Sequence, residues 1–275
     1  MSTLTIQPMQ MPAPERAIPG TRGWERMHAD HLARYFFAAR HCERARVLDA
    51  GTGPGYGAAI LHEAGARQVM AVDIDAPTIA QAAATYRLPH LAFIVDDCQT
   101  LQRVEGPFDL ICNFENIEHL QHPKQFLAQV VRLLDADGLF MCSTPDRNGP
   151  YQPWVNGRPN NPHHTIEWYA DEFRELLSTY FEEVDVRAQV MSHAAVQRGR
   201  AVQGLVAHLD YLWSNPVLRA ERADKRLLGR PNEWPTVTGF DIPDIGDYPI
   251  VSRCVTAAVG IPFCHVALCR RARRG

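Results

Sequence analysis

The run VLDAGTGPGYG at residues 47–57 decides the fold of this chain. An apolar stretch ends at the acid Asp49, and glycines then occupy alternate positions before a helix-compatible run at 58–61. Glycine is needed where a backbone turns sharply and comes close to a ligand, and free N–H groups at a helix start can face that ligand. A strand, a glycine turn and a helix in this order predict a crevice for a nucleotide-type cofactor.

Further short apolar runs alternate with helix-like stretches along the chain. The apolar runs cover residues 47–50, 69–72, 91–95, 108–113 and 139–143. Asp75 and Pro77 favour a helix over 76–86, Pro123 opens a helix over 124–134 that Gly138 is expected to stop, and another helix is expected at 171–181. This order predicts an α/β, Rossmann-like, doubly wound and mostly parallel sheet of seven strands, with ligands at the carboxyl ends of the strands.

The last third of the chain departs from this alternation. A strand-like run at 184–190 is followed by about 70 residues before the final strand at 264–270, and the intervening part contains a helix candidate at 194–213 and many prolines. We therefore expect residues 191–262 to form a cap over the strand ends, with a passive surface elaboration as the alternative. Residues 1–14 are expected to be a disordered lead-in, and 15–190 with 263–275 to form the cofactor-binding domain.

Composition restricts the class of protein. With 275 residues, 46% hydrophobic and 21% charged, the chain is typical of soluble globular proteins, and no run approaches the roughly 18 apolar residues of a membrane helix. The polar N-terminus is unlike a secretory signal, and the seven dispersed cysteines lack a Cys-x-x-Cys pair, so reduced thiols and a cytoplasmic location are expected. A net charge of −3 argues against broad nucleic-acid binding.

The glycine spacing separates two kinds of cofactor. A dinucleotide site requires Gly-x-Gly-x-x-Gly. Counted from Gly51, the third glycine position is occupied by Tyr56, and counted from Gly53, the strand before the motif would end two residues too late. The spacing Asp49-x-Gly51-x-Gly53-x-Gly55 instead resembles the first motif of the class I S-adenosylmethionine-dependent methyltransferases. These four residues are therefore expected to bind that cofactor.

The resemblance continues through later segments of the chain. It implies that Asp73 receives the ribose hydroxyls and that Asp97 and Cys98 contact the adenine, with Ile74 and Asn113 completing the cofactor set. Residues 108–111 and 133–140 are similar to the family's fourth- and fifth-strand motifs. Residues 15–20 and 30–35 resemble bacterial members that accompany glycan or natural-product assembly, in which this piece lies over the cofactor. The structural alternatives are a helix cap for Asp73 and a turn residue for Asp97.

A candidate reaction centre follows the fourth strand. If Glu115-Asn116-Ile117-Glu118-His119 were helical, its two carboxylates and imidazole would share one face beside the methyl group. The pattern is similar to that of ubiquinone-pathway O-methyltransferases and small-RNA 2′-O-methyltransferases, and the latter add a distant histidine, before a Glu-Trp pair, that matches His164. The resemblance implies that Glu115, Glu118, His119 and His164 hold Mg²⁺ or Mn²⁺. The alternative is a metal-free site in which His119 is a general base and Glu115 its partner.

The acceptor is expected to be a small molecule methylated on a hydroxyl group, such as a sugar, an aminocyclitol or another secondary metabolite. Aromatic and acidic side chains, which suit such ligands, gather in and before the expected cap: Trp154, Trp168, Tyr211, Trp213, Trp234, Phe240, Asp241, Asp244, Asp247 and Tyr248. These aromatics could equally form the core of the cap.

Several alternatives to this function stay open. They are an N-methyltransferase acting on an amine-bearing metabolite, an RNA 2′-O-methyltransferase, an NAD-dependent oxidoreductase and a non-catalytic binding protein that keeps the fold. No membrane partner is expected. Nothing in the sequence decides the oligomeric state, and a homodimer is an open alternative.

Overall fold

The computed structural model describes residues 22–149, 154, 157–192, 246 and 248–274. Its elements are α1 Arg22–Ala39, β1 Arg46–Ala50, α2 Tyr56–Glu63, β2 Gln68–Asp73, α3 Ala76–Thr85, β3 Leu91–Val95, β4 Phe108–Phe114, the 3₁₀ helix η1 Ile117–His119, α4 Pro123–Leu133, β5 Leu134–Pro145, α5 Ala170–Ser178, β6 Phe181–Ser192, β7 Ile250–Val251, the 3₁₀ helix η4 Arg253–Val255, α9 Thr256–Val259 and β8 Gly260–Ala272. All five apolar runs predicted as strands fall within β1 to β5.

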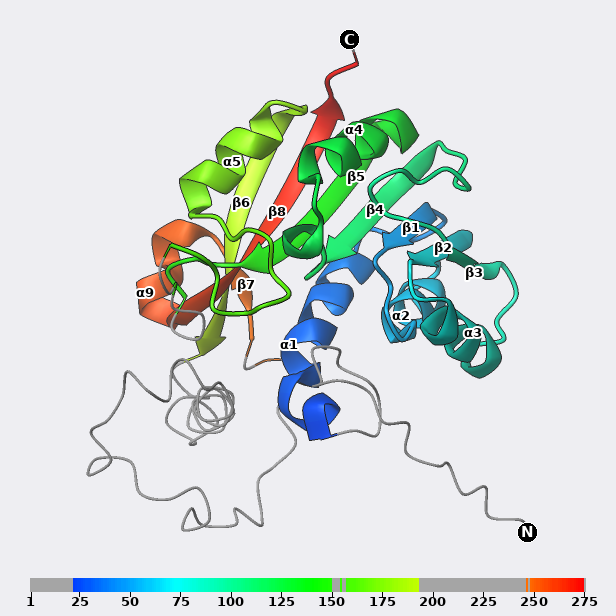
Figure 1. Ribbon diagram of the computed structural model, residues 1–275, viewed down its shortest axis with the longest axis horizontal. Helices are drawn as coiled ribbons and strands as arrows, with labels where there is room; N and C mark the ends of the chain where they lie inside the picture. Colours follow the sequence, from blue (N-terminus) through cyan, green and yellow to red (C-terminus); the bar gives the residue numbers. More distant parts are fainter. Residues whose placement is uncertain (1–21, 150–153, 155–156, 193–245, 247, 275) are drawn as a thin grey trace.

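The strands form one sheet in the order β3-β2-β1-β4-β5-β8-β6-β7 (Figure 1). Strands β1 to β5 are parallel to one another, whereas β8 lies antiparallel between β5 and β6. The mostly parallel α/β fold is thus confirmed. The two-residue strand β7, which pairs with β6 at the edge, adds an eighth strand to the seven that were predicted.

Helices cover both faces of the sheet. Successive side chains along a strand point to opposite faces, so each face has its own apolar side chains to bury. Val47 and Val69 point to the face that packs against α1 and α2, together with Leu61 of α2. Leu48 and Phe140 point to the opposite face, where they join the cluster that contains Phe126 of α4 and residues of α5. This double covering is why β1 is buried from Val47 to Ala50, including the carboxylate of Asp49.

Three helix boundaries were predicted from local residues, and the start at Pro123 is confirmed, since α4 begins there. The start at Asp75 is confirmed, since its carboxylate accepts a hydrogen bond from the Thr78 N–H at 3.1 Å. The predicted stop at Gly138 is wrong, because α4 ends at Leu133 and Gly138 lies inside β5. A side chain at Gly138 would meet Leu134 at 2.8 Å, so this glycine accommodates the irregular pairing of β4 and β5.

Most of the expected cap at 191–262, including the helix candidate 194–213, lies outside the described residues, as does the lead-in 1–14. The described end of that segment contacts the sheet. Tyr248 is buried against Met191 and packs edge-on to Phe263, with ring centroids 6.1 Å apart. Arg253 approaches His265 of β8 at 3.0 Å and Asp146, directly after β5, at 3.3 Å, so η4 is joined to the sheet at these two places.

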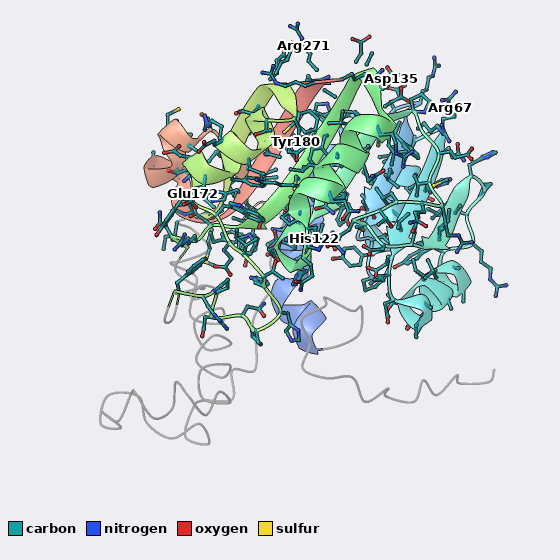
Figure 2. All side chains as sticks on the ribbon, turned by 45° about the horizontal axis from the view of Figure 1, so that its top comes forward. Arg67, His122, Asp135, Glu172, Tyr180 and Arg271 are labelled. Carbon is teal, nitrogen blue, oxygen red and sulfur yellow. The ribbon has the colours of Figure 1, made fainter. Side chains whose placement is uncertain are left out.

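The two edges of the sheet differ in character. Figure 2 shows Asp135 and Arg271 together at one edge, where β5 begins and β8 ends, and His122 at the other, which carries the carboxyl ends of the parallel strands.

All seven cysteines are free and only Cys254 is exposed. No helix among the described residues is both long and apolar enough to cross a bilayer.

Candidate functional site

The glycine turn after β1 forms a cradle at the carboxyl edge. Gly51, Gly53 and Gly55 all have left-handed backbones, with φ of 81°, 54° and 84°. The Gly51 N–H donates to the Val72 carbonyl at 2.8 Å, and the Gly53 N–H donates to Asp73 Oδ2 at 2.9 Å. The turn is therefore fixed to the end of β2, and α2 begins directly after it.

The residues expected at the ribose and adenine lie along this cradle. Asp73 is nearly buried at the end of β2 and also accepts from the Asp75 N–H at 3.0 Å, so it partly fulfils the alternative structural role. A carboxylate oxygen can accept more than one hydrogen bond. Ile74 is 66% exposed beside it, which leaves an apolar surface available to a flat ring. Cys98 is buried, and Asp97 accepts from the Gln99 N–H at 2.8 Å, as a turn residue does.

Asp49 and Asn113 support the cradle from beneath. Asp49 is fully buried and accepts hydrogen bonds from the Thr52 hydroxyl at 2.7 Å and the Tyr35 hydroxyl at 3.2 Å. Burial raises the pKa of Asp49 to about 6, against the opposing effect of these two hydrogen bonds. Asn113 donates to the Ala50 carbonyl at 2.7 Å. Both side chains thus position the turn.

The segment after β4 is not the helix that its residue pattern suggested. Glu115 has a left-handed backbone with φ of 50°, and only residues 117–119 form a 3₁₀ turn. A non-glycine residue in this conformation is strained, which marks a site where the surroundings impose the geometry. As a result Glu115 and Glu118 face different neighbours, although they are three residues apart.

Glu115 is engaged by groups other than the histidines. Its Oε1 accepts from the Ser143 hydroxyl at 2.8 Å and the Cys264 thiol at 3.3 Å, and it lies 4.0 Å from the Arg34 guanidinium. Burial raises the pKa of Glu115, but Arg34, His31 and these hydrogen bonds together outweigh burial and bring the pKa below its usual range. Glu115 is therefore an anionic partner of the buried Arg34, and the group of closely spaced ligand atoms is formed by the other three residues expected to bind the metal.

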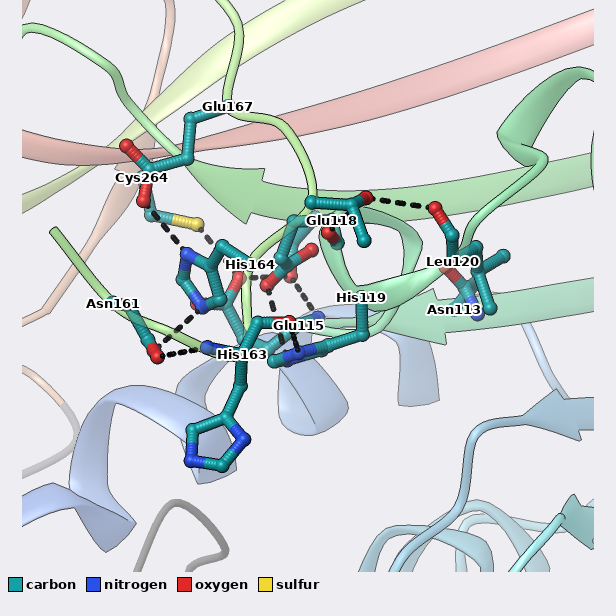
Figure 3. Close-up of polar contacts among 12 residues, drawn as sticks. Asn113, Glu115, Glu118, His119, Leu120, Asn161, His163, His164, Glu167 and Cys264 are labelled. Atoms are coloured by element: carbon teal, nitrogen blue, oxygen red, sulfur yellow. Dashed lines mark hydrogen bonds and ion pairs between the residues drawn. The ribbon is translucent and has the colours of Figure 1, made fainter. Parts of the chain in front are cut away.

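The other three predicted ligands come together. One ligand atom each from Glu118, His119 and His164 lies within 4.8 Å of the others, and the two imidazole rings meet edge-on with centroids 4.8 Å apart (Figure 3). Asn116 joins this cluster to the cradle, since a side chain on Gly51 would meet the Asn116 amide at 2.5 Å. The segment that carries Glu118 and His119 therefore packs against the glycine turn.

Glu118 has an unusual environment for a carboxylate. It is 1% exposed, and neither oxygen has a hydrogen-bond partner among the described residues, while His119 Nε2 lies 3.9 Å away. Burial, followed by repulsion from Glu115, raises the pKa of Glu118 well above its usual range. The Glu118 N–H and the Thr144 hydroxyl, which lie near the carboxylate without reaching hydrogen-bond geometry, and Arg34 oppose this effect without offsetting it. A buried carboxylate of this kind is stabilised by a proton or by a bound cation.

In both histidines Nδ1 faces a hydrogen-bond acceptor. His119 Nδ1 lies 3.1 Å from the His163 carbonyl, which can only accept, so the neutral ring carries its proton on Nδ1. His164 Nδ1 lies 2.7 Å from Glu167 Oε1. In each ring Nε2 is then left with a lone pair, which is the form that a metal ion or an acidic proton requires.

Several contributing residues were not predicted from the sequence. Tyr35 lies in the segment 30–35 that resembles bacterial methyltransferases, but its contact with Asp49 joins distant elements and has no local signal. Glu167, in contrast, has a local sequence signal, since a carboxylate three residues after a histidine can pair with that histidine. Trp168 is buried in the core, and Trp154, which is half-buried, donates to Glu167 at 2.8 Å.

Comparisons with known proteins identify a family model and several relatives that match this chain. A family model described as a methyltransferase domain matches residues 24–190, which is more than half of the chain. A probable S-adenosylmethionine-dependent methyltransferase of Mycolicibacterium smegmatis is 36% identical over 173 residues, covering 62% of this chain and 65% of the relative. A malonyl-acyl-carrier protein O-methyltransferase of Laribacter hongkongensis is 32% identical over 131 residues, covering 44% and 43%.

A solved structure, that of the 4+2 cyclase SpnF, has a TM-score of 0.55 at 16% identity and covers 89% of this chain and 82% of its own, which shows a shared fold. The chain spans less than two thirds of the length of its curated relatives, between 58% and 65% for three probable S-adenosylmethionine-dependent methyltransferases of mycobacteria.

Proposed function

Because the chain belongs to the methyltransferase domain family, we propose that it is an S-adenosylmethionine-dependent methyltransferase acting on a hydroxyl group of a small molecule, with a divalent cation at the acceptor. The observation that carries this proposal is the buried Glu118 carboxylate, without a hydrogen-bond partner among the described residues, beside two imidazoles and the glycine cradle. An amine acceptor would need no such cation site, because a neutral amine is nucleophilic enough to attack without activation, whereas a hydroxyl group is not.

The residues present fit the cofactor. The left-handed turn from Gly51 to Gly55 lets the backbone approach a ligand closely, and the Asp73 carboxylate is the kind of group that accepts from two vicinal hydroxyls. Ile74 offers an apolar face to the adenine. When bound, S-adenosylmethionine supplies a methyl group on a sulfonium, and its loss leaves a neutral thioether.

The residues present also fit a cation. Two imidazole nitrogens and one carboxylate suit Mn²⁺ or a similar transition ion better than Mg²⁺, which prefers oxygen ligands. A bound divalent ion supplies Lewis acidity that lowers the pKa of an acceptor hydroxyl. Glu118, His119 and His164 would hold it.

The chain's own groups align the reaction. Glu115, anchored by Ser143 and Arg34, keeps negative charge beside the cluster and fixes the end of β4. Methyl transfer from an activated sulfonium depends mainly on alignment of acceptor and donor, which the rigid strand ends provide. That one relative is named an O-methyltransferase supports oxygen as the acceptor atom.

A chelator experiment tests this proposal. A panel of hydroxylated metabolites is assayed with labelled S-adenosylmethionine, and Mn²⁺ binding is measured by titration for the wild type, for His119→Ala and for the control His122→Ala, which removes an exposed imidazole three residues away. We expect turnover to fall about 100-fold or more with chelator and in His119→Ala, as for loss of one electrostatic group at a reaction centre, and to be unchanged in His122→Ala. Turnover that survives chelation but needs His119 would instead make His119 a general base.

A further inference from the structure

Glu167 lies directly behind His164, on the side away from the cation cluster. The side chains of His164 and Glu167 are 4% and 0% exposed, and the Nδ1–Oε1 distance is 2.7 Å. We infer that Glu167 is a positioning residue of the site, which holds His164 in the tautomer and orientation needed to bind a cation through Nε2. This inference rests on the cation site of the proposed function.

The contact of the second carboxylate oxygen of Glu167 identifies the donors and the acceptors in this set of hydrogen bonds. Trp154 Nε1 lies 2.8 Å from Oε2, and an indole N–H can only donate. The Trp154 ring is in turn covered by the Arg147 guanidinium, 3.4 Å from its centroid. Glu167 is thus held as a double acceptor in a fixed position, and His164 Nδ1 is the donor.

Asn161 gives an independent indication of the same tautomer. Its Oδ1 accepts from the His163 N–H at 3.0 Å, which orients the amide so that Nδ2 faces His164 Nε2 at 2.9 Å (Figure 3). An amide N–H in that place requires a lone pair on Nε2. Donation from Nδ1 to Glu167 and acceptance at Nε2 from Asn161 therefore describe one neutral form of the ring.

This arrangement matches the way proteins prepare histidine ligands. A carboxylate behind the ring fixes the tautomer, increases the basicity of the free nitrogen and restricts ring rotation, and its removal typically weakens metal affinity about 10- to 100-fold. A cation at Nε2 would replace the Asn161 amide as the partner of that nitrogen. The plain structural alternative is a buried pair that only fastens the loop before α5.

Direct metal binding distinguishes these roles without an acceptor substrate. Mn²⁺ affinity is measured by electron paramagnetic resonance, and the visible spectrum of the Co²⁺ form is recorded, for wild type, Glu167→Gln, Glu118→Ala and the control Glu175→Gln, which changes an exposed carboxylate of α5. We expect Glu167→Gln to weaken Mn²⁺ binding about 10- to 100-fold and to alter the Co²⁺ spectrum, while Glu175→Gln matches wild type.

The outcomes separate this inference from the proposal on which it rests. If wild type and Glu118→Ala bind Mn²⁺ equally weakly, the cation site itself is absent. If wild type binds, Glu118→Ala does not, and Glu167→Gln binds as wild type does, the site stands and the role of Glu167 is overturned. Glu167→Asp, which withdraws the carboxylate by one methylene, provides the same comparison if Glu167→Gln does not fold, and wild-type affinity in it would also count against the inference.

Discussion

Asp49 is a buried carboxylate that both supports the glycine turn and can supply a negative charge to the cofactor site. It lies beneath the glycines and contacts Tyr35 and Thr52 rather than solvent, and burial raises its pKa from 3.8 to about 6. S-adenosylmethionine carries a sulfonium and an ammonium group, so ionised Asp49 favours its binding. Protonation below pH 6 removes that attraction.

We therefore expect the affinity for S-adenosylmethionine to fall as the pH drops below about 6, by up to about tenfold per pH unit, because binding then requires release of the Asp49 proton. Asp49→Asn should bind more weakly at pH 8 and lose this dependence. Calorimetric titrations between pH 5 and 8 measure both effects, with the exposed Glu105→Gln as control. An unchanged pH profile in Asp49→Asn would assign the dependence to another group.

The packing of α1 against α2 supports the glycine turn that forms the cradle. Gly57 in α2 lies against the Tyr35 ring, and a methyl group there would be 1.9 Å from Tyr35 Cζ. The same ring meets Tyr56 and Phe114 edge-on, with centroids 5.7 and 5.1 Å away. Displacement of Tyr35 would therefore also disturb its hydrogen bond to Asp49.

Gly57→Ala should lower the free energy of unfolding by about 1–3 kcal/mol, because overpacking outweighs the usual gain of alanine over glycine in a helix. In a Tyr35→Ala background the penalty should disappear, since the methyl group then has room. Urea unfolding of the two single variants and the double variant checks this coupling. Additive effects would show that the two residues are not in contact.

The whole molecule was predicted most reliably where local patterns determine structure. Apolar runs with turn signals identified β1 to β5, and the glycine spacing located the cradle, because both depend on residues close in sequence. The proximity of Glu118, His119 and His164 was anticipated from the family resemblance. The helix that was expected to bring Glu118 and His119 together is, however, only a 3₁₀ turn.

Contacts between distant segments could not be predicted. The pairing of Glu115 with Arg34 and Cys264 depends on how α1 and β8 meet the end of β4, which no sequence period encodes. The irregular start of β5 arises in the same way, since the space around Gly138 is set by Phe108 and Leu134 across two strands.

The central claim is that the crevice beside β1 binds a sulfonium nucleoside and not a redox dinucleotide. Isothermal titration with S-adenosylhomocysteine and with NAD⁺, on wild type and Asp73→Asn, tests it most directly. We predict that wild type binds S-adenosylhomocysteine only, and that Asp73→Asn weakens this binding at least about tenfold, as expected for loss of a charged hydrogen-bond acceptor. Binding of NAD⁺ alone, or full S-adenosylhomocysteine affinity in Asp73→Asn, would contradict it.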